Sequence, residues 1–487
     1  MKLVHDNLVY SAEKFPNRLA IIDGKRQINY QSLYFSSKSL GNHLSKLQNR
    51  GHIIIAHDNS SEFIIAFYAV IMSGMVAVPV DTDISDRNLK YIIDDVQPVG
   101  LFCSTKFLRS RDWIKNFDFF VDNRSNLLTD SLDLDLANEL VVSENDVAVI
   151  LYTSGTTGPQ KGTCLTHTSL VSAHQNIIRA LDLDEIPSLV ESIPMRFSHS
   201  FGLARVRIVI ALSGTICIEK GLIRPDRLLR NINTYNVNVL CGVPTAFDIL
   251  LSNYHEEVHK IAKKIVSIEL GSSPISKRLQ KQICSTFENA KIKMHYGLTE
   301  ASRSTFKDLR VLSNSVGYAS PNVEIAIENA DKEGFGEILI KGRHAAVGYL
   351  NKPKETEETF HNGWVRTGDI GALSDTGELH LLSRKSDLIN ISGLKVVPQE
   401  VEVIINLLPE CIESAVCGMK GDNYEGEFII AFIKTKTRIE LSRLQNHFKI
   451  NLENYKIPEK VVFVDEIPKT DNGKIKRNEL ISKWKEK

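Results

Sequence analysis

The stretch Leu151-Tyr-Thr-Ser-Gly-Thr-Thr-Gly-Pro-Gln-Lys-Gly162 follows a strand-like run, residues 146–150, and precedes a helical pattern that begins near Ser169. The backbone N–H groups and hydroxyls of such a loop can turn toward an anion, and Lys161 adds a positive charge, so the loop suits a polyphosphate. It is not a Walker A loop, because that motif requires adjacent Gly and Lys followed by Ser or Thr, whereas here Lys161 precedes Gly162. The alternative interpretation is a flexible loop rich in turn residues.

Strand-like and helix-like segments alternate on both sides of this loop. Helical patterns occupy residues 9–15 and 30–47 and start again at 62, and strand-like runs occupy 19–22, 53–56 and 76–80. Further strand-like runs follow at 237–241, 265–270 and 292–296. Strands separated by helical patterns of this length predict an α/β fold with largely parallel sheets.

The character of the sequence changes near residue 336. Short strands and turns at 336–341, 363–366 and 377–382 predict an antiparallel β region. After it, residues 399–464 hold two helical patterns and three strand-like runs, which is the content of a small α+β domain. We therefore expect a large N-terminal body of several subdomains, with parallel sheets, helices and a small β region, over residues 1–384, and a small C-terminal domain over residues 385–487.

The composition argues against a protein that depends on bulk electrostatics. The 487 residues include 59 Lys plus Arg and 59 Asp plus Glu, and 43% of the residues are hydrophobic. A nucleic-acid binder usually has a basic excess, and a disordered chain has low apolar content. We therefore expect a globular protein without a nucleic-acid partner.

Neither the cysteines nor the longest uncharged stretch indicates secretion or a membrane anchor. The seven cysteines show no CxxC spacing, and the N-terminus lacks the apolar run of a secretory signal, so we expect a cytoplasmic protein. Residues 63–80 carry no charge and approach the lower length limit of a spanning helix. Ser73-Gly74 interrupts them, so we predict a buried helix, a turn and a buried strand rather than an integral membrane segment.

Four further motifs carry groups that suit a nucleotide and a metal ion. His295-Tyr-Gly-Leu-Thr-Glu300 offers an aromatic face for a base, a hydroxyl for a phosphate oxygen and a carboxylate for Mg²⁺. In Trp364-Val-Arg-Thr-Gly-Asp369, the last carboxylate can accept hydrogen bonds from a ribose diol. The other two motifs are Ser383-Arg-Lys-Ser-Asp-Leu-Ile-Asn-Ile-Ser-Gly-Leu-Lys395 and Pro468-Lys-Thr-Asp-Asn-Gly-Lys474.

Taken together and in this order, the five motifs resemble those of the AMP-forming adenylating superfamily, which includes acyl- and aryl-CoA synthetases, stand-alone adenylation domains and beetle luciferases. The resemblance covers the chain from about residue 10 to Leu480. It implies that ATP and Mg²⁺ activate a small carboxylic acid to an acyl-adenylate with release of pyrophosphate. The acyl group would then pass to the thiol of coenzyme A or of the phosphopantetheine of a separate acyl or peptidyl carrier protein. The small domain would be mobile and turn about a hinge at about Ser386.

The resemblance also implies a role for individual residues. The β- and γ-phosphates would be held by Thr153, Ser154, Gly155, Thr156, Thr157, Gly158 and Lys161. The adenine pocket would be formed by Gly271, Ser272, Ser273, Tyr296 and Gly297. Thr299 would contact the α-phosphate, Glu300 would bind Mg²⁺, and Asp369 and Arg384 would contact the ribose. Lys474 would catalyse the first half-reaction. His199 would lie beside the acyl pocket, and Gly393 would line the thiol tunnel.

Several residues have a second interpretation. His199 can instead be an ordinary core or surface histidine. Arg205 and Arg207 lie about 200° apart on a helix, so we expect at least one of them to be exposed. Arg303 is expected to pair with an acidic residue of the protein itself. The sequence departs from the usual motifs at Pro159 and at Ser383, and neither departure removes a charged or catalytic group.

Three functions remain beside that of an acyl-CoA synthetase. One is a stand-alone enzyme that loads a carrier protein, the second is a non-catalytic nucleotide-binding protein, and the third is a luciferase-type oxygenase with the same adenylation motifs. A non-catalytic protein has no physical need to keep all of the charged motif residues, which are Lys161, Glu300, Asp369, Arg384 and Lys474. The segment 197–202 contains no Asp to hold a substrate amine, which favours a simple, apolar or aromatic acid over an α-amino acid.

Overall fold

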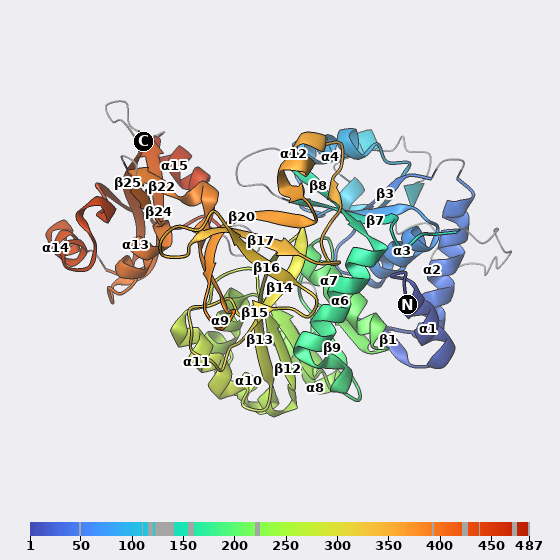
Figure 1. The fold of residues 1–487 in the computed structure, drawn as a ribbon. Helices are drawn as coiled ribbons and strands as arrows, with labels where there is room; N and C mark the ends of the chain where they lie inside the picture. The colour runs from blue at the N-terminus through green and yellow to red at the C-terminus, as the bar shows by residue number, and fades with distance from the viewer. Residues whose placement is uncertain are drawn as a thin grey trace.

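The computed structural model describes residues 1–47, 50–109, 111–114, 120–121, 141–153, 160–219, 225–391, 394–420, 427–437, 439–469 and 475–485. Two large sheets and a small antiparallel sheet make up the body, and a C-terminal unit, orange to red in Figure 1, lies to one side of it. This arrangement confirms the predicted α/β class with a large N-terminal body and a smaller C-terminal unit. The exact boundary at residue 384 stays a prediction.

The first large sheet carries the loop that opened the sequence analysis. Its seven strands follow the order β18 (Gly348–Tyr349), β8 (Lys161–Thr166), β7 (Val147–Thr153), β4 (Val76–Pro79), β3 (His52–Ala56), β5 (Gly100–Cys103) and β6 (Phe120–Val121). The strands from β7 to β6 are parallel, whereas β7–β8 and β8–β18 are antiparallel pairs. The helices of this region are α2 (Tyr30–Ser45), α3 (Ser61–Met72), α4 (Asp86–Val96), α5 (Thr105–Leu108) and the 3₁₀ turn η1 (Asp112–Ile114).

The apolar stretch at 63–80 folds as predicted. Helix α3 begins after Ser60, whose side chain accepts a hydrogen bond from the Phe63 N–H, and it ends at Met72. Gly74 has a φ of 66°, a left-handed conformation that suits glycine, and β4 begins two residues later. Within the described part of the chain, none of the helices has the length and apolar character needed to span a membrane. All seven cysteines are present as thiols.

The second large sheet positions most of the candidate site. Its strand order is β15 (Tyr318–Ala319), β14 (Ala301–Asp308), β13 (Lys291–Leu298), β12 (Ser267–Leu270), β11 (Val239–Gly242), β9 (Val190–Ile193), β10 (Thr215–Ile218), β1 (Leu19–Asp23) and β2 (Arg26–Asn29). The six strands from β13 to β1 are parallel. The accompanying helices are α1 (Asp6–Lys14), α6 (His167–Leu181), η3 (Leu183–Glu185), α7 (Ser200–Ala211), α8 (Pro225–Tyr235), α9 (Pro244–Asn253), α10 (His255–Ile261), η4 (Ala262–Lys264) and α11 (Lys277–Thr286).

The predicted antiparallel β region forms the third sheet. It contains β16 (Glu324–Glu328), β17 (Gly336–Lys341), β20 (Trp364–Leu373), β19 (Phe360–His361) and β21 (Leu379–Arg384), with α12 (Pro353–Thr359) between β18 and β19. The 3₁₀ turn η5 (Lys385–Asp387) then leads into the C-terminal unit. That unit has its own buried cores around β22 (Ile389–Ile391), β23 (Leu394–Val396), α13 (Pro398–Ile405), β24 (Cys411–Lys420), β25 (Glu427–Thr435), α14 (Leu441–Asn451), η6 (Asn454–Lys456), β26 (Lys460–Phe463) and α15 (Arg477–Lys485).

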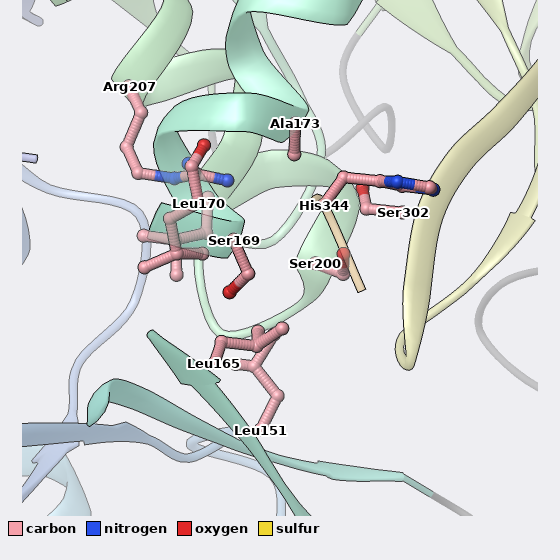
Figure 2. Close-up of a pocket in the computed structure, with 10 residues that line it drawn as sticks. Leu151, Leu165, Ser169, Leu170, Ala173, Ser200, Arg207, Ser302 and His344 are labelled. Atoms are coloured by element: carbon pink, nitrogen blue, oxygen red, sulfur yellow. The ribbon is translucent and has the colours of Figure 1, made fainter. Parts of the chain in front are cut away.

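The prediction that Arg205 or Arg207 would be exposed is wrong. Both lie on α7, whose two faces are covered because the helix packs in the core that the two large sheets share, and their exposed fractions are 0% and 3%. Arg205 forms ion pairs with Glu191 and Glu269. Arg207 donates to the Leu170 carbonyl at 2.7 Å and lines a small cavity between α6 and α7, which Figure 2 shows. Acids of distant segments thus hold the Arg205 guanidinium, and a distant carbonyl holds Nη1 of Arg207, whose buried Nε has no hydrogen-bond partner among the described residues.

Candidate active site

The base of the phosphate loop is an antiparallel β-hairpin. Thr153, the last residue of β7, pairs with Lys161, the first residue of β8, and the hydroxyl of Tyr91 donates to the Gln160 carbonyl at 2.9 Å. The loop residues between them, Ser154, Gly155, Thr156, Thr157 and Gly158, lie outside the described residues. The hairpin therefore fixes where the loop starts and ends.

Lys161 lies in a short chain of contacts that reaches the predicted Mg²⁺ ligand. Its Nζ is 4.9 Å from the ring centroid of Tyr349, within the range of a cation–π contact. The Tyr349 hydroxyl donates to Glu300 Oε1 at 2.7 Å. Burial, with Glu300 adding to it, raises the pKa of Tyr349 far above its usual range, so the phenol stays protonated. Tyr349 thus links the two groups, with the loop lysine over its ring and the carboxylate at its hydroxyl.

Glu300 is suited to a magnesium ion. It lies with Thr299 in the turn between β13 and β14, and its Oε2 has no hydrogen bond to a described residue. Mg²⁺ keeps several waters and needs only one or two carboxylates when phosphates complete its shell. Among the described residues, no group of three or more His, Cys, Asp or Glu side chains could hold a metal ion. A single carboxylate beside a phosphate loop fits the ion that the motifs imply.

Three motif residues from separate parts of the sequence meet at Asp369. The Tyr296 hydroxyl donates to Asp369 Oδ2 at 2.7 Å, and Arg384 Nε lies 2.8 Å from Asp369 Oδ1. Asp369 and Arg384 face each other across the pair β20–β21. Burial first, and then the charge of Asp369, raise the pKa of Tyr296 well above its usual value.

Glycines allow the backbone segments of the predicted adenine pocket to approach each other. A Cβ atom on Gly271 would lie 2.1 Å from His295 Cε1, and one on Gly297 would lie 2.4 Å from the Arg303 backbone N. Neither position can accept a side chain without movement of its neighbours. Ser272 has a φ of 72°, and the buried Ser273 Oγ has no hydrogen-bond partner. The segment after β12 is therefore tightly packed against β13.

An ionic cluster lies next to this segment. It confirms the prediction that Arg303 pairs with an acidic residue of the protein itself. Glu269 Oε1 lies 2.6 Å from Arg303 Nε and 2.7 Å from His295 Nδ1, and Glu269 Oε2 lies 2.8 Å from Arg205 Nη1. Arg205 also holds Glu191 through two contacts of 2.5 Å. Burial would raise the pKa of Glu269, but the positive charges of Arg303 and Arg205 and the contact with His295 lower it well below its usual range.

His199 lies at the start of α7, next to an acidic residue. Its Nε2 is 3.5 Å from Asp81 Oδ2, and Asp81 also forms an ion pair with Arg196. The His199 side chain is 37% exposed, so it is not a buried core histidine. Gly393 and Lys474 lie outside the described residues. Lys469 and Ile475, which flank Lys474 in the sequence, form an isolated antiparallel bridge.

Two family models match the chain. The model described as AMP-binding enzyme matches residues 8–350, and the model described as AMP-binding enzyme C-terminal domain matches residues 400–474. The first match alone covers more than half of the sequence. The chain belongs to the AMP-binding enzyme family.

This AMP-binding enzyme is similar over nearly its whole length to proteins that are named as CoA ligases. The chain is 27% identical to 2-succinylbenzoate–CoA ligase of Staphylococcus aureus (97% of this chain, 99% of the relative) and 27% identical to 4-coumarate–CoA ligase 1 of Narcissus pseudonarcissus (98% and 93%). The o-succinylbenzoate CoA synthetase MenE of Bacillus subtilis, solved with its acyl-adenylate OSB-AMP, matches with a TM-score of 0.85 and 25% identity, covering 97% of both chains. MenE has also been solved with ATP and a magnesium ion. The function supported for this AMP-binding enzyme is that of an adenylate-forming CoA ligase that uses ATP and Mg²⁺ and a small carboxylic acid.

Sequence reasoning missed two residues of this AMP-binding enzyme site, Tyr349 and Glu269. Tyr349 comes from β18, which reaches Glu300 only because it pairs with β8. Glu269 had a signal, since it is the one charged residue in the strand-like run 265–270. A buried carboxylate requires partners, and here they are Arg205, Arg303 and His295.

Proposed function

We propose that the chain binds ATP at the junction of β13, β14, β20 and β21, joins it to a small carboxylic acid, and transfers the acyl group to coenzyme A. The main support for the nucleotide site is that Tyr296 and Arg384 both contact Asp369. Tyr296 and Arg384 hold both carboxylate oxygens, so Asp369 is oriented and charged where a ribose diol can donate to it. Tyr296, with Gly271 and Gly297 beside it, would supply the adenine surface.

The phosphates would lie between the β7–β8 hairpin and the turn that carries Thr299 and Glu300. Lys161 supplies positive charge on one side of Tyr349, and Glu300 would hold Mg²⁺ on the other. Bound Mg²⁺ would neutralise charge on the phosphates. Tyr349 has a positioning role in this arrangement, because its hydroxyl fixes one oxygen of Glu300 and leaves the other for the ion.

Charge neutralisation explains the other residue types. The acid carboxylate attacks the α-phosphate, which brings two anions together, and pyrophosphate leaves without a general base. Lys474 would lie between the attacking oxygen and the α-phosphate. The acyl-adenylate is a mixed anhydride that water would hydrolyse, so a closed site is required.

The second half-reaction would use the same site after a movement of the C-terminal unit. We place the boundary of the two domains at residues 384–385 and the hinge at about Ser386, within η5. A rotation there would withdraw Lys474 and bring the loop of Gly393 to the thiol. The relatives are named CoA ligases, which supports coenzyme A as the acceptor over the phosphopantetheine of a carrier protein.

Isotope exchange between labelled pyrophosphate and ATP tests this function. The purified chain is incubated with Mg-ATP and a panel of carboxylic acids, and we expect acid-dependent exchange. Asp369→Asn should reduce exchange at least about tenfold through weaker nucleotide binding, whereas Asp331→Asn, in a surface turn of the same sheet region, should leave it unchanged. Exchange with none of the acids would overturn the proposal. Mass detection of acyl-CoA then identifies the acceptor.

A further inference from the structure

Helix α4 packs against the hairpin from which the proposed phosphate loop extends (Figure 1). Its apolar residues Leu89, Ile92 and Val96 share a buried cluster with Ile150 of β7 and Cys164 of β8. The segment 86–96 belongs to none of the five sequence motifs. A helix that is packed on both strands of a hairpin can hold the loop between them in one geometry.

Two side chains on one face of α4 each contact one strand of this hairpin. Tyr91 and Asp95 are four positions apart, so they lie on the same side of the helix. The Tyr91 hydroxyl donates at 2.9 Å to the carbonyl of Gln160, one position before β8 begins. The hydroxyl of Tyr152, one position before the end of β7, donates to Asp95 Oδ2 at 2.7 Å. The helix therefore holds the chain next to both ends of the phosphate loop.

The ring of Tyr152 also packs across the hairpin. Tyr152 pairs with Gly162 of β8, and a Cβ atom on Gly162 would lie 3.0 Å from Tyr152 Cζ. The absence of a side chain at Gly162 thus leaves room for the phenol ring against the neighbouring strand. Burial, and then the hydrogen bond to Asp95, raise the pKa of Tyr152 far above its usual range. The hydroxyl therefore stays protonated and remains a donor to Asp95.

The segment after β18 connects the hairpin back to α4. The Leu350 N–H donates to the Gly162 carbonyl at 2.8 Å. Asn351 Nδ2 donates to the backbone carbonyl of Asp95 at 2.7 Å, and Lys352 Nζ lies 3.9 Å from Asp95 Oδ1. Helix α4, strands β7 and β8 and the segment 350–352 thus form a closed ring of contacts. Neither strand of the hairpin can move relative to α4 without breaking one of them.

We propose that Tyr91, Tyr152 and Asp95 are positioning residues for ATP, because they hold the two ends of the phosphate loop in the geometry that binds the β- and γ-phosphates. This inference rests on the proposed function. Without these hydrogen bonds the loop has more conformational freedom, which ATP must remove when it binds. AMP has neither a β- nor a γ-phosphate, so its affinity does not depend on the loop. A general loss of structure would weaken the binding of both nucleotides.

Isothermal titration calorimetry with Mg-ATP and with AMP, in the absence of an acid, tests the inference. In the double variant Tyr91→Phe with Tyr152→Phe, the Kd for Mg-ATP should rise at least about tenfold through the loss of two hydrogen bonds. The Kd for AMP should stay unchanged. An unchanged Kd for Mg-ATP, or an equal rise for both nucleotides, would overturn the inference. A wild-type chain that binds neither nucleotide would overturn the proposed function itself.

Pyrophosphate exchange gives a second measurement on the same double variant. The KM for Mg-ATP should rise in proportion to the Kd, while the KM for the acid stays the same. An unchanged KM for Mg-ATP would contradict the inference. If the double variant does not fold, Tyr91→Phe alone decides, since it keeps the ring and removes only the hydrogen bond to the loop end.

Two further variants serve as controls. Asp95→Asn keeps an oxygen that can accept from Tyr152, so the Kd for Mg-ATP should stay within about threefold of the wild-type value. Tyr235→Phe is the matched control, because it removes a phenol that donates to the Gly24 carbonyl at 3.3 Å beside the second large sheet. It should leave the affinities for Mg-ATP and AMP unchanged. If Tyr235→Phe weakens Mg-ATP as much as the double variant does, the effect is not specific to α4 and the inference is wrong.

Discussion

The Tyr349 hydroxyl donates to Glu300 Oε1 at 2.7 Å and so joins the edge strand of the first sheet to the β13–β14 turn of the second. Tyr349→Phe removes this hydrogen bond and leaves Glu300 less well oriented for Mg²⁺. We expect the KM for Mg-ATP to rise about tenfold, corresponding to roughly 1.4 kcal/mol, with little change in the KM for the acid. Tyr30→Phe removes a buried hydroxyl that donates to Gly214 far from this site, and it should leave both constants unchanged.

The proposed role of Lys474 predicts that the two half-reactions respond differently to its loss. Lys474→Ala should reduce adenylation, measured by pyrophosphate exchange, by about 100-fold or more, while thioesterification of supplied acyl-adenylate should be much less affected. Lys469, five positions before Lys474 in the sequence, pairs with Glu413, and Lys469→Ala should change neither step strongly. Equal loss of both half-reactions in Lys474→Ala would contradict a movement of the C-terminal unit.

Arg477 ties the start of α15 to the hinge region. Its Nη2 lies 2.6 Å from Glu402 Oε1 and its Nη1 lies 3.4 Å from Asp387 Oδ2, next to Ser386. Arg477→Gln leaves Glu402 buried without its cation, and we expect a loss of roughly 3 kcal/mol in the free energy of unfolding, measured with urea. The double variant Arg477→Met with Glu402→Leu removes both charges and should be more stable than Arg477→Gln. If the single and the double variant lose the same free energy of unfolding, the unpaired charge of Glu402 is not the cause of the loss.

Buried histidines predict a loss of stability in mild acid. Burial lowers the pKa of His167 and of His344 to about 4 and that of His174 to about 3. The unfolded chain therefore binds more protons below about pH 6.5, so the free energy of unfolding falls as the pH drops from about 6.5 toward 4.

Thermal denaturation between pH 7 and pH 5 measures this effect. At pH 5 each of these histidines should account for roughly 2 kcal/mol of the loss. His344→Gln should make the decrease in Tm between the two pH values smaller, whereas His255→Gln, at an exposed position, should not alter it. A wild-type Tm that is the same at pH 7 and pH 5 would contradict the prediction.

The order of strands and helices could be predicted from the sequence because each segment carries its own apolar pattern. The strand-like runs 19–22, 53–56 and 265–270 correspond to β1, β3 and β12, and their limits differ from the observed ones by at most two residues. The terminal helix α15 was not predicted, since the segment 477–485 alternates charged and apolar residues without a clear helical stripe.

Contacts between distant segments could not be predicted in the same way. The acidic partners of Arg205 lie 14 and 64 positions away, so helical geometry alone gave the wrong expectation of exposure. The motif residues Tyr296, Asp369 and Arg384 could be named from their motifs, but the hydrogen bond and ion pair that join them depend on the pairing of β20 with β21 and on how that sheet packs against β13.

The interleaving of the two large sheets has a consequence for biogenesis. Strand β1, near the N-terminus, pairs with β10, and the hairpin that carries Lys161 acquires its outer neighbour, β18, only from residues 348–349. A ribosome must therefore release most of the body before either sheet is complete. Nascent chains that stop short of Tyr349 leave the edge of β8 open to pairing with other chains, and they should depend on chaperones more than chains that extend beyond it.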